Sequence, residues 1–369
     1  MKQFFAGNEA AAEGAVRAGC KVYFGYPITP QNEIPQYMSW RLPQAGGLFL
    51  QAESELAAIN MVHGASSVGV RVMTSSSSPG ISLKQEGISY MCGCELPAVI
   101  INVQRGGPGL GNIAPSQSDY FQATKGGGHG DYHMIVLAPH TVQEFADLTG
   151  TAFNLADEYR APVLVLADGF LGQMMEPVEF VDRPPKIYDK SSWMLSGAKG
   201  RDPRIIRSLF LVEGVLEKHN IALQKKYDVI RSKEIRFEVD QVADADWVFI
   251  AYGTCARICR ETMGTLREKG IKAGLFRPIS LWPFPYEQIK KTCIHAKGIL
   301  VVEMNSGQML EDVRLAAERI IPIYFYGRLG GGVPGIAALS RRIEELEAAS
   351  KSGEQPPQEK TFWLATSDV

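Results

Sequence analysis

Short apolar runs alternate with helical patterns along the first half of the chain. Five such runs predict buried strands, at 22–24, 70–74, 98–103, 134–137 and 163–166. The spacing of apolar positions between them predicts helices over 8–17, 53–68, 79–91 and 141–159. Thr141 is the predicted N-cap of the last helix, with Glu144 in the capping-box position. This order is typical of a parallel α/β sheet, and the run at 98–103, apolar on both faces, is expected at its centre.

The alternation resumes in the second half after a less regular stretch. The polar run that contains Pro184 and Pro185 is typical of a linker, and an amphipathic helix is predicted over 203–226. Beyond it we predict strands at 244–253, 272–276, 298–303 and 323–326, and helices at 255–269, 286–292 and 334–349, with another beginning near Met309. We therefore divide the chain into a first α/β domain (1–190), a linker with a helix (191–240), a second α/β domain (241–350) and a loose tail (351–369).

Composition excludes several classes of protein. The 369 residues are too many for one compact domain, and 45% hydrophobic with 21% charged residues is ordinary for a folded chain. The net charge of −2 gives no attraction to nucleic acid. No apolar run reaches the roughly 20 residues that span a bilayer, and the N-terminus turns polar too early for a signal peptide.

The six cysteines are expected to be buried thiols. Cys92/Cys94 and Cys255/Cys259 are the close pairs, and neither has a second pair at zinc or iron–sulfur spacing. Thiols used in this way are typical of a reducing compartment, so we expect a cytoplasmic protein with no metal site of its own.

Three loops that follow predicted strands carry unusual residues, and functional groups in such sheets gather at the carboxyl ends of strands. In Tyr26-Pro27-Ile28-Thr29-Pro30, two prolines stiffen the backbone around a hydroxyl; the alternative is a rigid turn before a helix. In the run from Thr74 to Gly80, four serines precede Pro79, which is predicted as the first helical residue. These hydroxyls could cradle an anion or simply cap the helix.

The third loop, from Arg105 to Gly111, is headed by an arginine and rich in glycine. An arginine here can pair with a carboxylate or phosphate through two hydrogen bonds, and the alternative is a flexible loop with a solvated side chain. Separately, Glu55 is followed by small and apolar residues, as in a buried helix. A glutamate in a first helical turn commonly answers the helix dipole, but a buried one must be paired or protonated, which suits acid–base chemistry.

Taken together, these motifs resemble the alpha subunit of the 2-oxoacid:ferredoxin oxidoreductases. The resemblance depends on Tyr26-Pro27-Ile28-Thr29-Pro30, Glu53-Ser54-Glu55, Ser78-Pro79-Gly80 and Gln104-Arg105-Gly106-Gly107-Pro108. The second half resembles the transketolase C-terminal domain, through Ala251-Tyr252-Gly253-Thr254, the run from Arg277 to Pro285, and Val302-Glu303-Met304-Asn305. The implied fold is a pyrimidine-type thiamine-diphosphate domain, with a doubly wound parallel sheet, followed by that second α/β domain.

The resemblance implies oxidative decarboxylation of a 2-oxoacid with coenzyme A, giving acyl-CoA and reduced ferredoxin. Glu55 would hydrogen-bond the aminopyrimidine ring of thiamine diphosphate and so favour the imino tautomer that activates the cofactor. Thr29 would bind a substrate oxygen, and Arg105 the substrate carboxylate or part of coenzyme A. The cofactor would also lie against Tyr26, Pro27, Ile28, Ser78 and Pro79, and the substrate or coenzyme A against Gly109, Leu110 and Gly111.

The resemblance also implies partner subunits. The diphosphate half of a thiamine site uses Gly-Asp-Gly to hold magnesium, and Ala167-Asp168-Gly169 is the nearest approach to it. No CxxC ferredoxin pattern occurs either. Mg²⁺ and a [4Fe-4S] cluster are therefore expected on partners: a cofactor-binding beta subunit, a gamma subunit, a ferredoxin-like delta subunit, and ferredoxin itself as acceptor.

The loop Gly109-Leu110-Gly111 is the expected specificity element. It resembles subunits labelled for 2-oxoisovalerate, and its few polar donors suit an apolar side chain, with 2-oxoglutarate as the alternative substrate. Two other functions stay open: the beta subunit of a lipoamide-linked 2-oxoacid dehydrogenase E1, and a non-catalytic assembly or regulatory paralogue. A nicotinamide enzyme is disfavoured because the glycines do not form Gly-x-Gly-x-x-Gly at the start of a helix.

Overall fold

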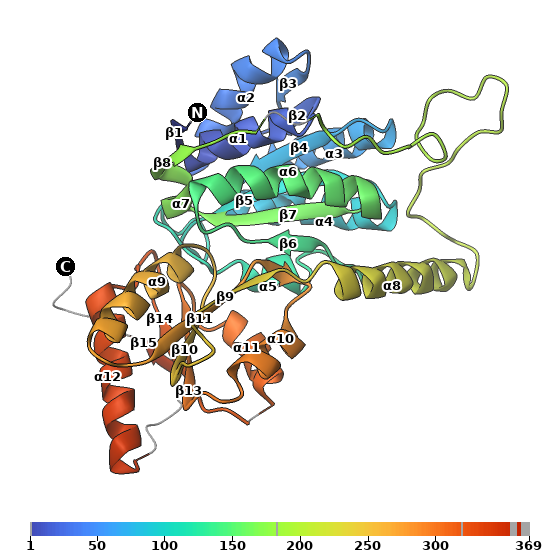
Figure 1. Cartoon of the computed structure of the whole chain (residues 1–369). Helices are drawn as coiled ribbons and strands as arrows, with labels where there is room; N and C mark the ends of the chain where they lie inside the picture. The colour runs from blue at the N-terminus through green and yellow to red at the C-terminus, as the bar shows by residue number, and fades with distance from the viewer. Residues whose placement is uncertain (1, 182–183, 319, 355–359, 363–369) are drawn as a thin grey trace.

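The chain forms two α/β units, each built around its own sheet (Figure 1). The structure is a computed structural model, and it describes residues 2–181, 184–318, 320–354 and 360–362. The first unit contains a seven-stranded sheet in the order β12-β6-β7-β5-β4-β2-β3, the second a six-stranded sheet in the order β15-β14-β13-β10-β11-β9. A separate pair joins β1 (Gln3–Ala6) to β8 (Met175–Val178).

The first sheet contains the five predicted strands and one further strand at each edge, neither of which was predicted. Its strands are β2 (Val22–Gly25), β3 (Leu48–Gln51), β4 (Val72–Ser76), β5 (Ala98–Gln104), β6 (Ile135–Leu137), β7 (Pro162–Asp168) and β12 (Ser280–Trp282). Every residue of β5 is buried, and β5 pairs in parallel with β4 on one side and β7 on the other, so the predicted central strand is confirmed. The antiparallel edge strand β12 comes from the second half of the sequence and was not predicted.

Helices cover both faces of this sheet (Figure 1). They are α1 (Gly7–Arg17), α2 (Glu33–Gln44), α3 (Glu55–Ser67), α4 (Ser78–Gly93), α5 (Tyr120–Thr124), α6 (Val142–Tyr159) and α7 (Gly169–Gln173). α1 packs on α6, and α3 packs on α4. The hydroxyl of Thr141 accepts a hydrogen bond from the backbone N–H of Glu144 at 3.1 Å, which confirms the predicted N-cap.

The second unit repeats this architecture. Its strands are β9 (Phe237–Asp240), β10 (Trp247–Ile250), β11 (Ala273–Pro278), β13 (Gly298–Glu303), β14 (Ile323–Gly327) and β15 (Lys360–Phe362). Its helices are α9 (Gly253–Glu268), α10 (Tyr286–Cys293), α11 (Met309–Ala317) and α12 (Ile336–Ser352), with α12 packed on α9 and α10 on α11. The pairs within β11-β10-β13-β14-β15 are parallel, and β9 joins the edge antiparallel.

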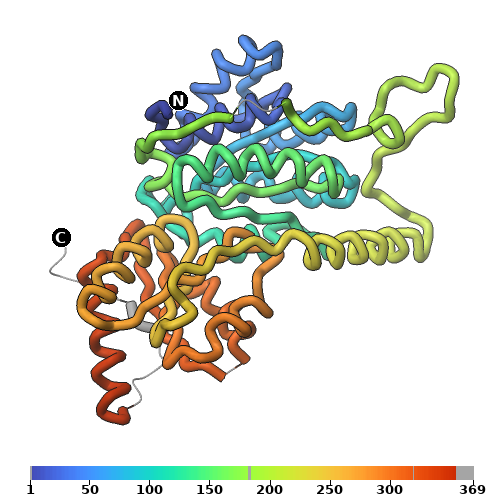
Figure 2. Tube along the Cα trace, in the orientation of Figure 1, coloured from blue at the N-terminus to red at the C-terminus, as the bar shows by residue number. Residues whose placement is uncertain are grey.

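Two predictions about local structure were wrong. The helix expected over 203–226 is instead α8 (Val215–Lys233); it begins after Gly214, whose φ of +74° lies in the left-handed region that glycine favours. The apolar residues before it, which suggested one helical face, are largely exposed on a segment that extends away from the first unit (Figure 2). The tail is also not loose throughout, because β15 pairs with β14.

Buried hydrogen bonds fix the two units against each other. The side-chain amide of Gln117, fully buried, donates to the carbonyl of Tyr252 at 2.9 Å and accepts from the backbone N–H of Met304 at 3.0 Å. The hydroxyl of Thr254, on α9, donates to Asp168, at the end of β7, at 2.9 Å. The carboxyl edge of the first sheet is thus held in a fixed relation to the second unit.

Candidate active site

The predicted site residues lie along the carboxyl edge of the first sheet. Glu55 begins α3, the loop from Tyr26 to Gln31 follows β2, the serine run follows β4, and the loop headed by Arg105 follows β5. Parallel strands bring these segments to one edge because all their carboxyl ends point the same way.

Glu55 is buried at the start of α3. The helix begins two residues later than predicted, since Ser54 is its N-cap and accepts the backbone N–H of Ala57 at 3.1 Å. The carboxyl group lies against Gly80 of α4: a Cβ atom added there would lie 2.5 Å from Oε1 of Glu55 and closer still to Oγ of Ser76. Gly80 is therefore needed for the close approach of α4 to the Glu55 carboxyl.

The predicted residues Thr29, Arg105 and Leu110 are joined by hydrogen bonds. The guanidinium of Arg105 donates to the carbonyl of Thr29 and to that of Leu110, each at 3.0 Å. The side chain is only 8% exposed, so the alternative of a solvated arginine is wrong. Its Nε is buried and has no partner among the described residues. Arg105 thus ties the loop after β2 to the loop after β5, and its Nε–H stays available to a ligand.

The glycine-rich loop closes on itself. The backbone N–H of Asn112 donates to the carbonyl of Gly106 at 3.0 Å, and Gly109 and Gly111 adopt positive φ values of +72° and +59°. A Cβ atom on Gly111 would collide with that same carbonyl, so the turn requires glycine. Leu110 points outward with 81% of its surface exposed. The predicted specificity loop therefore presents an apolar side chain beside the Arg105 guanidinium.

The serine run serves mainly to organise this edge. Ser77 is the N-cap of α4 without a side-chain cap bond, and Pro79 is the second helical residue rather than the first. Ser78 donates to the carboxylate of Asp119 at 2.6 Å and accepts the backbone N–H of Arg105 at 3.1 Å. The hydroxyls of Ser76 and Ser77 are buried and have no partner among the described residues.

Sequence reasoning missed Asp119, which lies at the centre of this arrangement. Asn102, on β5, donates to the same carboxylate oxygen as Ser78, at 2.8 Å. Burial raises the pKa of Asp119, against the hydrogen bonds from Ser78 and Asn102, which lower it. No motif marked Asp119, because the loop that carries it folds back onto β5 only in three dimensions.

A second missed residue is Lys84, on α4. It is fully buried, and its Nζ donates to Oγ1 of Thr74 at 2.5 Å and to the carbonyl of Ser75 at 3.0 Å. One signal in the sequence could have identified it: Lys84 stands one turn after Gly80, on a helix face whose other residues are buried.

The remaining predicted residues form the rim. Tyr26, Pro27 and Thr29 are exposed and Ile28 is half-buried. Within the described part of the chain, the hydroxyl of Thr29 accepts only a long hydrogen bond, 3.5 Å, from the side chain of Asn32, so it is open to a ligand. Exposed apolar side chains continue the rim on neighbouring segments, namely Leu56, Leu83, Leu110 and Ile113.

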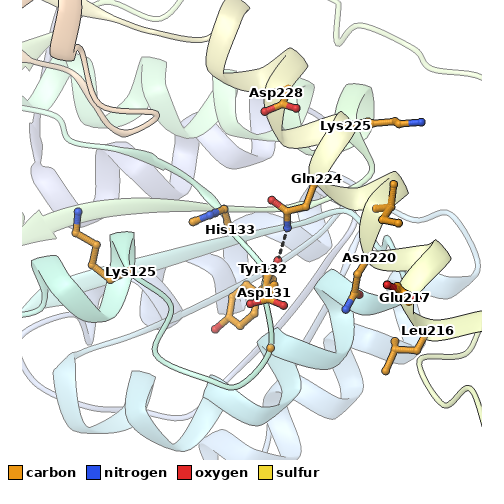
Figure 3. A pocket seen from close by; sticks show the side chains of 12 residues that line it. Lys125, Asp131, Tyr132, His133, Leu216, Glu217, Asn220, Gln224, Lys225 and Asp228 are labelled. Atoms are coloured by element: carbon orange, nitrogen blue, oxygen red, sulfur yellow. Dashed lines mark hydrogen bonds between the residues drawn. The ribbon is translucent and has the colours of Figure 1, made fainter. Parts of the chain in front are cut away.

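A cavity elsewhere does not coincide with this edge. It has a volume of about 810 Å³ and lies between residues 125–133 and α8 (Figure 3). The side chain of Gln224 bridges its walls by donating to the carbonyl of Asp131 at 2.8 Å. None of the predicted cofactor or substrate residues lines it.

The described residues were also searched for metal sites, disulfides and membrane-spanning helices. No group of three or more histidine, cysteine, aspartate or glutamate side chains among them could hold a metal ion. All six cysteines are free thiols, five buried and Cys94 half-buried. Within the described ranges no helix is long and apolar enough to cross a membrane.

Comparison with protein families matches nearly the whole chain. Residues 13–228 match the family described as pyruvate flavodoxin/ferredoxin oxidoreductase, thiamine diphosphate-binding, and residues 245–338 match pyruvate:ferredoxin oxidoreductase core domain II. The ketoisovalerate oxidoreductase subunit VorB of Methanothermobacter marburgensis is 49% identical over 348 residues, covering 94% of this chain and 99% of the relative. The 2-oxoglutarate synthase subunit KorA of Methanocaldococcus jannaschii is 37% identical, covering 94% and 98%.

Two solved structures have a similar fold, and one of them is also related in sequence. The 2-oxoglutarate:ferredoxin oxidoreductase from Magnetococcus marinus superposes with a TM-score of 0.85 at 30% identity, covering 93% of this chain and 65% of that one. A split-gene transketolase, in an inactive beta4 tetramer, superposes with a TM-score of 0.58 at 15% identity, covering 92% and 97%, and so shares the fold alone. The site geometry, the two family matches and the full-length relatives lead to one conclusion: the chain belongs to the 2-oxoacid:ferredoxin oxidoreductase family, as a thiamine-diphosphate-binding-type subunit.

Proposed function

We propose that this subunit supplies the aminopyrimidine half of a thiamine-diphosphate site in an enzyme that converts a 2-oxoacid and coenzyme A to acyl-CoA, carbon dioxide and reduced ferredoxin. The observation that carries the proposal is the buried carboxyl of Glu55, held against Gly80 at the edge where the Thr29 and Arg105 loops meet.

The residues at this edge fit that half of the cofactor. A buried carboxyl suits a ring nitrogen, the close approach at Gly80 fixes its position, and the partnerless hydroxyls of Ser76 and Ser77 are available to polar atoms. Tyr26, Pro27, Ile28, Ser78 and Pro79 would flank the ring. When bound, the cofactor supplies the carbanion chemistry of decarboxylation. Glu55 would hold a proton at the ring nitrogen and keep that nitrogen in place.

The substrate end of the site would be formed by the two loops that Arg105 joins. The free hydroxyl of Thr29 would donate to the substrate oxygen. The unused Nε of Arg105, with the fixed guanidinium plane, would face the substrate carboxylate or coenzyme A. The exposed Leu110 and the flanking Gly109 and Gly111 offer an apolar contact and no second cation, which favours 2-oxoisovalerate or another branched acid over 2-oxoglutarate.

The rest of the enzyme would come from partners. The exposed apolar side chains on the segments of this edge suit a covering subunit. The sequence has no Gly-Asp-Gly segment for Mg²⁺ and no CxxC segment for a cluster. We therefore assign Mg²⁺ and the diphosphate to a beta subunit, the [4Fe-4S] cluster to the partners, and electron transfer to a ferredoxin-like delta subunit and ferredoxin. A gamma subunit completes the complex, which we place in the cytoplasm.

Substitution of Glu55 tests this function. Glu55→Gln keeps the size of the side chain but removes its charge, so the assembled complex should form normally and lose nearly all 2-oxoacid-dependent viologen reduction. Glu53→Gln, two residues earlier and exposed, is the matched control and should keep activity. Full activity in the Glu55 variant would refute the assignment of the cofactor to this edge.

A further inference from the structure

Lys84 is a buried lysine on α4, the helix that also carries Gly80 beside Glu55. Its side chain is fully buried, and its Nζ contacts two neutral acceptors from β4, Oγ1 of Thr74 and the carbonyl of Ser75. Neither acceptor balances a positive charge. A buried ammonium is costly unless a carboxylate lies close by, so the surroundings of Lys84 should contain one.

That carboxylate is Glu55. Gly80, Lys84 and Gly87 recur every three to four residues and so share one face of α4. Gly80 lies against the Glu55 carboxyl, and Gly87 lies against Ile59, one turn further along α3. Lys84 therefore stands between these two contacts, on the side of α4 that faces α3, with its side chain directed back toward the level of Gly80.

The electrostatics agree with this geometry. Burial lowers the pKa of Lys84 to about 7, and the Coulombic attraction of Glu55 opposes that shift. Glu55 is the charged group that acts on Lys84 within the described part of the chain; the facing groups of β4 are the neutral Thr74 and Ser75. The ammonium is thus poised to change charge near neutral pH.

We propose that Lys84 is the positioning residue for Glu55, holding its carboxyl group toward the aminopyrimidine ring. This inference depends on the proposed role of Glu55. With Lys84 charged, its attraction would hold the Glu55 carboxyl group in place for the ring nitrogen. With Lys84 neutral, that attraction would be lost.

Calorimetric titration of thiamine diphosphate into the cofactor-free complex, in the presence of Mg²⁺, tests this role. Lys84→Met should weaken binding about tenfold or more at pH 6, since it removes the positive charge that attracts the Glu55 carboxyl group. The difference in thiamine diphosphate affinity between the variant and the unsubstituted complex should become smaller at pH 9, where Lys84 is already neutral. Lys226→Met is the matched control: Lys226, on α8, pairs with Glu95 at 2.9 Å, and its loss should not change the pH dependence.

Three outcomes would overturn the proposal. The first is an equal loss of affinity at both pH values, and the second is no loss, because each makes Lys84 structural. The third is full affinity for thiamine diphosphate in Lys84→Gln, a variant that keeps a hydrogen-bond donor at this position but carries no charge. Should Lys84→Met fail to fold, Lys84→Gln carries the same pH comparison.

The Glu55→Gln background separates this proposal from the proposed function. If Lys84 acts through Glu55, adding Lys84→Met to Glu55→Gln should cause no further loss of affinity at pH 6. Additive losses would overturn the role of Lys84 and leave Glu55 at the cofactor. Unchanged affinity in Glu55→Gln alone, together with unchanged turnover, would instead refute the proposed function.

Discussion

Replacing Arg105 by lysine tests whether one guanidinium organises the substrate loops. The two carbonyls that it binds, those of Thr29 and Leu110, lie on different loops, each 3.0 Å from a guanidinium nitrogen. A lysine ammonium is compact and would reach one of them, so one loop is released. A hydrogen bond from a charged group contributes about 1.5–3 kcal/mol. If the loops must be ordered before substrate binds, this loss raises a Michaelis constant by about tenfold to a hundredfold.

Steady-state viologen reduction by the assembled complex, with the 2-oxoacid and coenzyme A varied separately, measures this effect. The Michaelis constant that rises identifies which ligand the two loops hold. Arg71→Lys is the control. The side chain of Arg71 is also largely buried and donates to Asp157 at 2.8 Å, but it lies at the amino end of β4, away from the site. It should lower stability without moving either constant. Unchanged constants in Arg105→Lys would show that the guanidinium plays no part in substrate binding.

Two further substitutions follow from the packing. Gly80→Ala inserts a methyl group 2.5 Å from Oε1 of Glu55 and should lower turnover by about tenfold to a hundredfold, because it displaces the Glu55 carboxyl group. Gly64→Ala on α3 is the control and should leave turnover unchanged, because a Cβ atom added there meets no neighbouring group within 4 Å. Equal turnover in both variants would contradict the close contact at Gly80. Burial raises the pKa of Glu144, but bonds from His140 and Arg277 outweigh burial and lower that pKa from 4.5 to about 2. The Glu144 carboxylate should therefore contribute about 3 kcal/mol of stability above pH 4.5, lost as the pH falls toward 2. Urea unfolding of Glu144→Gln should show lower stability at pH 7 and a weaker dependence on acid; an unchanged acid profile would refute this contribution.

Local pattern predicted much of the fold because each strand and helix of the parallel sheet buries its own apolar face. The pattern failed where an element depends on contacts distant in sequence or on the position of a proline within a helix. α2 was missed since it contains Pro35 and Pro43, yet Pro35 lies in the first turn, where no backbone N–H is needed. β12 was missed because its partner β6 is more than a hundred residues away in sequence. The helix expected over 203–226 followed an apolar pattern whose first part does not form one buried face: Ile205, Leu209 and Leu211 are exposed, and only Leu223, within α8, is buried.

The candidate site shows the same division. Glu55, Thr29 and Arg105 could be proposed because they stand in recognisable motifs at strand ends. Asp119 and Lys84 could not, since each is marked only by contacts across the fold. Asp119 accepts hydrogen bonds from Ser78 and Asn102, and Lys84 donates to Thr74 and Ser75 of β4. A buried charge in the middle of a helix carries no local signal of its partner.

We propose that this chain forms half of a thiamine-dependent 2-oxoacid oxidoreductase site. The most direct measurement is anaerobic reduction of a low-potential viologen by the protein purified with its native partners, across branched, dicarboxylic and pyruvate substrates. We expect reduction that requires the 2-oxoacid, coenzyme A and thiamine diphosphate together, with branched acids preferred. A complete complex, loaded with cofactor and cluster, that reduced no viologen with any of these acids would contradict it.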